Sequence, residues 1–261
     1  MEKSIAVSVR DLVKTYGDEG QEHLVLDNIS FDVGEGTLTT IVGPSGSGKS
    51  TLLNVLSGLE PYKSGKVEVR SNKNTYADLG YVFQSPRLLP WLTINDNIMF
   101  VRPKRVAEAI HQQRANHYLE MVGLKGVGHK FPYQLSGGMQ QRAGLARGLS
   151  VEPAVLLMDE PFSHLDEITA EQMRSELLRI WQETGRTIIF ITHDMQEAIQ
   201  LGDRIIMLGY HGTIVEDIQI DLPRPRQFTD HAFVDFYADV VARFHKMQAD
   251  RAEELAEVEV S

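Results

Sequence analysis

Residues 38–59 place a glycine-rich loop between an apolar strand pattern and a helical pattern, an order that few folds contain. The strand LTTIVG runs directly into GPSGSGKST, and KSTLLNVLSGL continues with helical spacing. Glycines let the backbone curl so that successive N–H groups point inward, and the N-terminus of a helix attracts anions. The sequence therefore predicts an α/β protein with a phosphate-binding P-loop rather than a flexible Gly/Ser linker.

The side chains of this loop suit a nucleoside triphosphate with Mg²⁺. Lys49 supplies a positive charge to the β- and γ-phosphates, the Ser50 hydroxyl can ligate Mg²⁺, and Thr51 adds a donor near the α-phosphate. We expect the residues that contact the nucleotide here to be Gly43, Ser45, Gly46, Gly48, Lys49, Ser50 and Thr51.

Other polar residues follow the predicted strands. Asp159 comes at the end of the apolar strand AVLLMD, at the sheet edge where α/β proteins bind ligands, and can orient Mg²⁺ through water. Glu160 is placed to polarise an attacking water as a general base, although adjacent acids also occur at solvated strand ends. His193, after TIIFI, can contact the γ-phosphate or the water. Gln84 can touch both Mg²⁺ and the water, and Tyr16 offers a ring face to adenine.

The bulk composition narrows the class of protein. The 261 residues are 42% hydrophobic and 24% charged, as in ordinary folded domains, with a formal net charge of −10. Such an acidic chain has no overall positive electrostatic field to attract nucleic acid. The absence of cysteine excludes disulfides and thiol chemistry. We find no secretory signal and no apolar run of about 20 residues. We therefore expect a cytosolic protein that needs another chain to span a membrane.

Strand and helix patterns alternate through most of the chain, which predicts a mostly parallel sheet covered on both faces. A helix is expected within RVAEAIHQQRANHYLEMVGL, and its apolar face would comprise Val106, Ala109, Ile110, Tyr118, Leu119 and Val122. A second helix, within HAFVDFYADVVARFHKM, is expected to pack on the core through Phe233, Phe236, Tyr237, Val240, Val241 and Phe244. We expect no chemical role for His111, His117, His129 and His245.

The predicted fold class is α/β. It comprises a P-loop NTPase core with a mostly parallel sheet, an N-terminal antiparallel β subdomain and an inserted helical lobe. We expect a single domain over residues 1–261. Its predicted parts are a core of residues 1–84 and 149–228, a helical lobe of residues 85–148 and a C-terminal helix of residues 229–261.

The motifs GPSGSGKST, LSGGMQQR, LLMDEP, SHLD and THD, together with Gln84, resemble those of ABC-transporter nucleotide-binding domains in order and spacing. The resemblance covers nearly the whole chain and implies an ATPase that binds ATP and Mg²⁺. It also implies a head-to-tail dimer, expected here to be a homodimer. In it, Ser136, Gly137 and Gly138 cap the γ-phosphate held by Lys49 of the partner subunit. Asp166 matches the loop that crosses this interface.

One position departs from the family pattern, because the loop reads SHLD where SALD is common. The departure places His164 near the expected dimer interface. A protonation-sensitive contact and a neutral substitution both remain open for this residue.

Two further stretches resemble the nitrate/sulfonate/taurine branch of ABC importers: SPRLLPWLTINDNIMF and QIDLPRPR. The resemblance implies a membrane-spanning permease that docks near Gln84–Leu92, an indirect partnership with a solute-binding protein, and a place on the cytoplasmic face of the membrane. Simple packing of the lobe is the alternative for the LLPWL segment. An exporter ATPase is the alternative function, whereas DNA-maintenance relatives carry long coiled coils that are absent from this sequence.

Overall fold

The computed structural model describes residues 4–17, 22–70, 77–210 and 212–259. The chain forms two compact units, each assembled from separate stretches of sequence. The first unit comprises Met1–Val7, Val33–Thr37 and Val69–Ile189, and the second comprises Ser8–Asp32, Leu38–Glu68 and Phe190–Ser261.

The first unit combines parallel strands with helices. Its elements are β5 (Ala77–Val82), α2 (Ile94–Phe100), α3 (Glu108–Met121), the short 3₁₀ helix η1 (Pro132–Gln134), α4 (Gly137–Ser150), β6 (Pro153–Asp159) and α5 (Glu167–Thr184), followed by the start of β7 (Thr187–Ile191). Strands β5 and β6 pair in parallel, with Tyr81 opposite Leu157. Because β6 is almost entirely buried, its residues are nearly all apolar, as expected for a strand covered on both faces.

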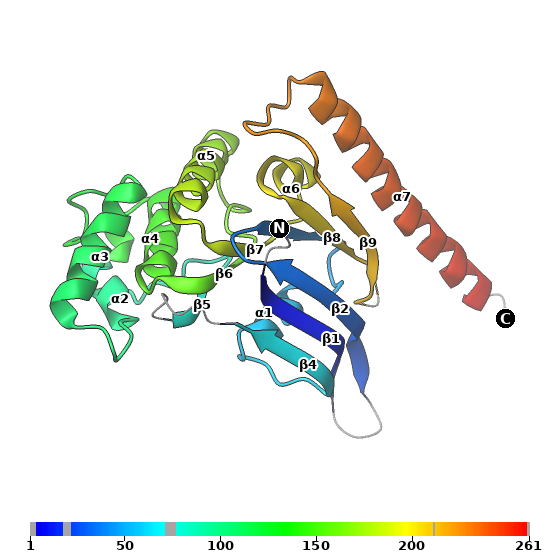
Figure 1. Cartoon of the computed structure of the whole chain (residues 1–261), viewed down its shortest axis with the longest axis horizontal. Helices are drawn as coiled ribbons and strands as arrows, with labels where there is room; N and C mark the ends of the chain where they lie inside the picture. The colour runs from blue at the N-terminus through cyan, green and yellow to red at the C-terminus, as the bar shows by residue number, and fades with distance from the viewer. Residues whose placement is uncertain (1–3, 18–21, 71–76, 211, 260–261) are drawn as a thin grey trace. The chain divides into compact units, whose positions relative to one another are not determined.

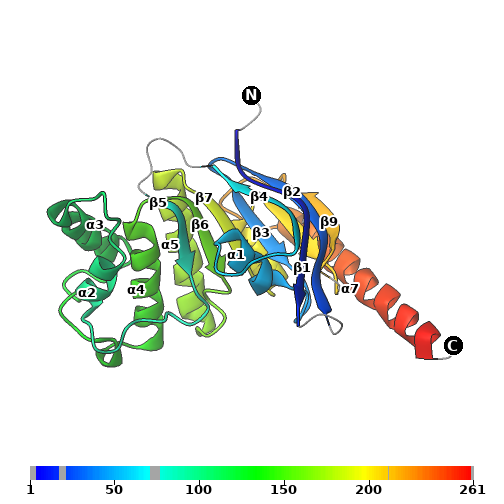
Figure 2. The same cartoon turned by 90° about the horizontal axis from the view of Figure 1, so that it is seen from below.

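Helices α2, α3 and α4 pack against one another within this unit (Figure 2). The sequence predicts the buried side of α3 only in part: Tyr118 and Leu119 are buried, as are Val106 and Val122 beside the helix. Ile110 is 48% exposed and Ala109 is also exposed, whereas His111 and Ala115 are fully buried. The Nε2 atom of His111 lies 3.0 Å from the Ile98 carbonyl oxygen of α2 and so has a hydrogen-bond partner. Because this polar atom has a partner, the His111 side chain can be buried, which the apolar pattern did not indicate.

The burial of His111 predicts a pH-dependent stability. Burial lowers the pKa of His111, and the nearby cations Arg114 and Arg102 act in the same direction, against the Ile98 hydrogen bond and Glu152. Within the described residues the Nδ1 atom of His111 has no hydrogen-bond partner, so its protonation would bury a charged N–H without an acceptor.

The unfolded chain takes up this proton near pH 6.5, and the folded chain only at lower pH. The free energy of unfolding should therefore be greatest above pH 6.5 and fall as the pH drops below it. His111→Gln keeps a donor for Ile98 but does not titrate, so urea unfolding from pH 8 to pH 5 should show a shallower decline than in the wild type. An unchanged pH slope would contradict this assignment.

The second unit contains most residues of two groups of strands. One is the sheet ordered β2-β1-β4, formed by β1 (Ile5–Tyr16), β2 (His23–Gly34) and β4 (Ser64–Val69) (Figure 1). The other contains the end of β7, then β3 (Leu38–Val42), β8 (Arg204–Leu208) and β9 (Ile214–Gln219). Strands β3 and β8 pair in parallel, whereas β9 pairs antiparallel with β8. The helices of this unit are α1 (Lys49–Leu56), α6 (Met195–Leu201) and α7 (His231–Glu259).

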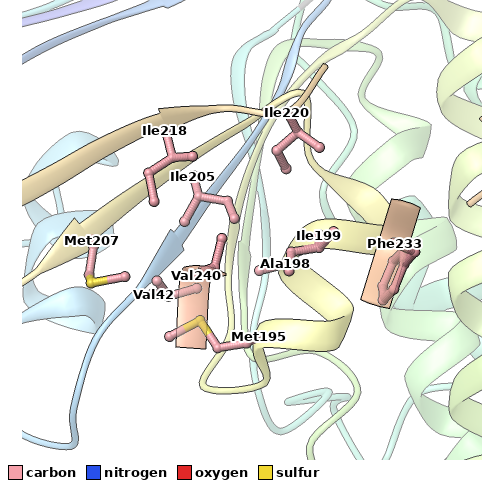
Figure 3. Packing of buried hydrophobic residues seen from close by; sticks show 10 residues of the cluster. All are labelled: Val42, Met195, Ala198, Ile199, Ile205, Met207, Ile218, Ile220, Phe233 and Val240. Carbon is pink, nitrogen blue, oxygen red and sulfur yellow. The ribbon is translucent and has the colours of Figure 1, made fainter. Parts of the chain in front are cut away.

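Helix α7 covers part of the core of the second unit. Phe233 and Val240 are buried in a cluster with residues of α6, β3, β8 and β9 (Figure 3). Phe236, Tyr237, Val241 and Phe244 are partly buried against the same cluster, as the helical spacing predicts. The helix continues to Glu259, inside the range of 229–261 predicted for the C-terminal helix, and residues 260–261 lie outside the described residues.

The segment QIDLPRPR, which precedes α7, has a structural role at the end of α6. Arg226 is 6% exposed, and its guanidinium donates hydrogen bonds to the carbonyl oxygens of Ile199 (2.6 Å), Leu222 (2.9 Å) and Ile220 (3.2 Å), and also to that of Gly202. The last carbonyls of a helix have no partner within the helix, so Arg226 supplies the missing donors for α6. Burial, together with the charge of Arg224, lowers the pKa of Arg226 to about 10, so it stays protonated at neutral pH.

These observations confirm the predicted fold class, with parallel pairing in the core strands and an antiparallel N-terminal sheet. The boundaries predicted for a core, a lobe and a C-terminal helix stay a prediction. No helix among the described residues has the length and apolar character needed to cross a bilayer.

Candidate functional site

The P-loop opens helix α1 in the second unit. Gly48 is the N-cap of α1, with φ of +89°, and a Cβ atom there would lie 2.8 Å from the Val25 carbonyl oxygen. Only glycine fits both the left-handed backbone and this close approach. Because the N-cap is a glycine, it contributes no capping side chain to the start of α1. Ser45 and Gly46 are exposed, which leaves the loop accessible.

The interior of the loop suits a phosphate group. The Lys49 ammonium is 2.8 Å from the Gly43 carbonyl oxygen and 2.9 Å from that of Pro44, and Lys49 is 7% exposed. The buried Ser47 hydroxyl has no hydrogen-bond partner within the described residues. The start of a helix, a cation held at the loop and the buried Ser47 hydroxyl together form a donor set that suits an anion. These residues therefore fit a bound triphosphate.

His193 leaves the sheet beside the P-loop. The Thr192 N–H donates to the Ile41 carbonyl oxygen at 3.2 Å, so the ends of β7 and β3 are neighbours in the second unit. His193 follows Thr192, just beyond the end of β7, and is exposed. Gly43 comes two residues after Ile41. Asp194 then caps α6 by accepting the Gln196 N–H at 2.8 Å. The structure thus places His193 and the P-loop at one sheet edge, and contact of His193 with the γ-phosphate or the water stays a prediction.

Tyr16 ends strand β1 and is 39% exposed. The Lys14 ammonium lies 4.1 Å from the centroid of its ring, and Lys14 also forms an ion pair with Glu60 at 3.3 Å. One face of the Tyr16 ring is therefore covered by a cation. Stacking of adenine on the other face stays a prediction.

In the first unit, Asp159 lies at the carboxyl end of β6 and contacts the neighbouring strand. The Tyr81 hydroxyl of β5 donates to Asp159 Oδ2 at 3.5 Å. Burial, followed by the negative charge of Asp159, raises the pKa of Tyr81, so the hydroxyl keeps its proton and remains a donor. Sequence reasoning missed Tyr81, because a tyrosine inside an apolar strand pattern carries no signal of this contact.

Glu160 and Gln84 come together beyond the ends of β6 and β5. The Gln84 side-chain amide lies 3.5 Å from the Glu160 carboxylate and 3.2 Å from the Ser163 hydroxyl. Ser163 in turn donates to the Glu160 carbonyl oxygen at 3.0 Å. Glu160 has φ of +41°, an uncommon backbone conformation for a residue with a side chain. Such conformations are more frequent at functional sites, and the role of Glu160 as general base stays a prediction.

The signature segment and the loop containing Asp166 meet in the same unit. Ser136 is the N-cap of α4 and accepts the Met139 N–H at 3.3 Å. Asp166 is the N-cap of α5 and accepts both the Thr169 N–H at 3.0 Å and the Thr169 hydroxyl at 2.7 Å. These hydrogen bonds hold the pKa of Asp166 below its usual value. A Cβ atom on Gly138 would lie 3.0 Å from a Thr169 methyl group, so the two helix starts are adjacent.

A cavity of about 530 Å³ opens next to the Gln84 segment. Its lining residues include Tyr81, Phe83, Arg87, Leu89, Phe100 and Arg147. Phe100 is 71% exposed, and Trp91, just beyond the cavity lining in sequence, is 69% exposed. The cavity is thus mainly apolar with two cationic side chains, and Arg87 and Leu89 of the Gln84–Leu92 segment contribute to its lining.

Arg147 was missed by sequence reasoning although it belongs to the helix that LSGGMQQR opens. It donates to the carbonyl oxygens of Pro86 (2.7 Å) and Arg87 (2.9 Å), which fixes the backbone of the segment after Gln84. Burial lowers the pKa of Arg147. An arginine on a helix face gives no indication in sequence of the loop that it will hold.

Comparison with known proteins gives consistent matches. The ABC transporter family model matches residues 26–163. The aliphatic sulfonates import ATP-binding protein of Burkholderia cenocepacia is 41% identical over 92% of this chain and 87% of its own length. The nitrate import ATP-binding protein of Synechococcus elongatus is 42% identical over 82% of this chain and 81% of its own length.

A solved structure extends the comparison to the fold. It is an ATP-binding cassette described as a dimer in a post-hydrolysis state bound to ADP and Pi. It aligns with a TM-score of 0.71 and 31% identity, covering 85% of this chain and all of that chain. With the P-loop, the signature segment and the Gln84–Glu160 contact in place, the chain belongs to the ABC transporter family, as an ATP-binding subunit with ATPase chemistry.

Proposed function

We propose that this chain hydrolyses ATP to power the import of a small solute of the nitrate, sulfonate or taurine type. The observation that carries the proposal is the identity of 41–42% to import ATP-binding proteins named for aliphatic sulfonates and nitrate, over more than four fifths of this chain. The QIDLPRPR segment supports the proposal less directly. Its Arg226 has a structural role at the end of α6, and this role by itself explains the presence of the arginine.

For the chemistry, we assign ATP to the P-loop, Glu160 to the activation of the attacking water, and His193 to the γ-phosphate. Mg²⁺, when bound with the nucleotide, would neutralise phosphate charge, and the residues we propose to hold it are Ser50, Gln84 and Asp159. Within the portion of the chain that the structure covers, no cluster of three or more His, Cys, Asp or Glu is placed to hold a metal. The proposed set therefore relies on a hydroxyl, an amide and one carboxylate, with phosphate oxygens supplying further ligands.

For assembly, we propose that two copies pair head to tail, with Ser136, Gly137 and Gly138 of each copy contacting the nucleotide of the other. Two observations support this arrangement. The two glycines and Ser136 form an accessible helix N-terminus, and Asp166 lies beside it through Thr169. The related solved structure is described as a dimer. Hydrolysis would then remove contacts that hold the closed dimer together.

For the membrane partner, we propose that a short segment of a membrane-spanning subunit occupies the cavity beside Gln84. Exposed Phe100 and Trp91 favour apolar side chains in that segment, and Arg87 with Arg147 at the cavity favours an acidic residue beside them. The relatives are named as import ATP-binding proteins, which implies a separate permease. This chain would then work at the cytoplasmic face of the membrane, with a solute-binding protein on the other side.

The test is a transport assay on the whole complex. The complex would be purified from native membranes through a tag on this chain and reconstituted in liposomes with the ATPase subunits facing outward. Labelled taurine, nitrate or an alkanesulfonate would be enclosed together with the solute-binding protein, and ATP would be added outside. An importer moves solute towards the side that carries its ATPase subunits, so the labelled solute should leave the vesicles only when ATP is present.

The control is the same complex carrying Glu160→Gln, which should release no solute. In a second preparation with the labelled solute outside the vesicles, its ATP-dependent accumulation inside would instead identify an exporter. ATP hydrolysis without movement of any of these three solutes would overturn the proposed substrate class while leaving the ATPase function intact.

A further inference from the structure

Tyr81 connects the cavity of the first unit with Asp159. Its side chain lines the 530 Å³ cavity, and its hydroxyl reaches Asp159 Oδ2 at 3.5 Å. The connection follows from the strand register, because Tyr81 lies opposite Leu157 in the parallel pair and Asp159 is two residues further along β6, on the same face. One side chain therefore contacts both the proposed docking cavity and the proposed Mg²⁺ ligand.

A stack of side chains extends this connection to the rim of the cavity. The rings of Tyr81 and Phe83 are stacked, with centroids 4.2 Å apart. The Arg87 guanidinium lies 4.3 Å from the centroid of the Phe83 ring. Arg147 holds the Arg87 backbone through its hydrogen bond of 2.9 Å. The exposed Arg87 and the carboxylate of Asp159 are thus joined by an unbroken series of contacts.

We propose that Tyr81 is a positioning residue that orients Asp159 and transmits the state of the cavity to it through the Tyr81–Phe83–Arg87 stack. The hydroxyl restricts the rotation of the Asp159 carboxylate, and the ring of Phe83 fixes the hydroxyl in turn. A segment that enters the cavity contacts Phe83 and Arg87. It thereby changes how strongly the Phe83 ring restricts the motion of the Tyr81 side chain. This inference rests on the proposed nucleotide and Mg²⁺ binding of the chain. Groups that hydrogen-bond to a ligating carboxylate typically change metal affinity 10–100-fold when removed.

The experiment measures metal binding rather than turnover. The dissociation constant of Mn²⁺ would be determined on the full chain with a non-hydrolysable ATP analogue, from the electron paramagnetic resonance signal of free Mn²⁺. Tyr81→Phe removes only the hydroxyl and should weaken Mn²⁺ binding about tenfold. Phe83→Leu should cause a smaller loss. The double variant should bind Mn²⁺ no more weakly than Tyr81→Phe alone, because both changes act through the same hydroxyl.

The matched control is Tyr118→Phe, the same change at a buried tyrosine of α3 outside the cavity lining, and it should leave Mn²⁺ binding unchanged. The affinity for the analogue in EDTA should equal that of the wild type in every variant. Wild-type Mn²⁺ affinity in Tyr81→Phe, or an equal loss of analogue affinity in EDTA, would overturn the positioning role. If the loss of Mn²⁺ affinity in the double variant equals the product of the two single losses, transmission through the stack would be overturned. Failure of the wild type itself to bind Mn²⁺ would instead overturn the proposed metal assignment, and the inference with it.

Discussion

Replacing Glu160 with glutamine should slow ATP hydrolysis by about 10²–10⁴-fold, the contribution typical of a general base. Glutamine keeps the size of the side chain and can still hydrogen-bond to Gln84, which lies 3.5 Å from the Glu160 carboxylate. It cannot accept a proton from the attacking water. The change should therefore remove the chemical step and leave ATP binding intact, as measured by phosphate release and by equilibrium nucleotide binding.

The same variant should accumulate as a dimer when ATP is present. Light scattering coupled to size exclusion should show the 29.4 kDa chain roughly doubling in mass with ATP and remaining a monomer without it. A bulky residue in place of Ser136 should abolish the dimer but not ATP binding, because the signature segment would contact only the nucleotide of the other copy. Lys49→Ala is the contrasting change, because it should weaken ATP binding itself through loss of the P-loop cation.

Turnover at the wild-type rate in Glu160→Gln would remove Glu160 as the base. A Glu160→Gln protein that binds ATP but stays monomeric would show that closure requires the membrane subunit or a different ATPase partner. In that case the dimer measurement should be repeated on the complex purified through this chain.

Replacing Arg226 with methionine should lower the free energy of unfolding by about 3 kcal/mol, because buried carbonyl groups would lose their donors at a typical cost of about 1–3 kcal/mol each. Four backbone carbonyls accept hydrogen bonds from the guanidinium, and Arg226 is 6% exposed. Methionine retains most of the apolar stem, so the loss reports the hydrogen bonds rather than packing. Urea unfolding at pH 7 measures the effect.

Arg243→Met provides the matched control for this change. Arg243 lies on α7 with its side chain 45% exposed, and it pairs with Asp239 and Glu216 at the surface. Exposed ion pairs of this kind contribute little to stability. Equal midpoints for the two variants would contradict the role of Arg226 at the end of α6. Arg226→Lys should fall between wild type and Arg226→Met, since lysine retains the charge but lacks the planar fork of donors.

The fold class and the candidate site differ in how far the sequence specifies them. The P-loop, the signature segment and the Asp159–Glu160 pair are contiguous motifs, and their chemistry depends on neighbours along the chain. Strand β3 and helix α1 flank the P-loop as the apolar and helical patterns predict. The order of these motifs was sufficient to identify the ABC family.

Contacts between distant residues were decided by the tertiary structure. The apolar pattern of α3 predicted Ile110 in the core, but the packing of α2 and α4 around α3 buries His111, whose ring reaches the Ile98 carbonyl oxygen. Arg226 is typical of an exposed residue by type, yet the end of α6 buries it against backbone carbonyls. In both cases a polar group is buried because a partner from another element satisfies it.

The sequence alone therefore determined the class of chemistry, a P-loop ATPase of the ABC family, because phosphate binding requires a short, locally encoded combination of glycines, lysine and a helix start. Only the tertiary structure decided that Tyr81 meets Asp159 and that Gln84 meets Glu160. These pairs are far apart in the chain, and parallel pairing of β5 with β6 brings them together. The physical reason is that a motif carries its own hydrogen-bonding groups, whereas the environment of a side chain depends on which strands and helices become its neighbours.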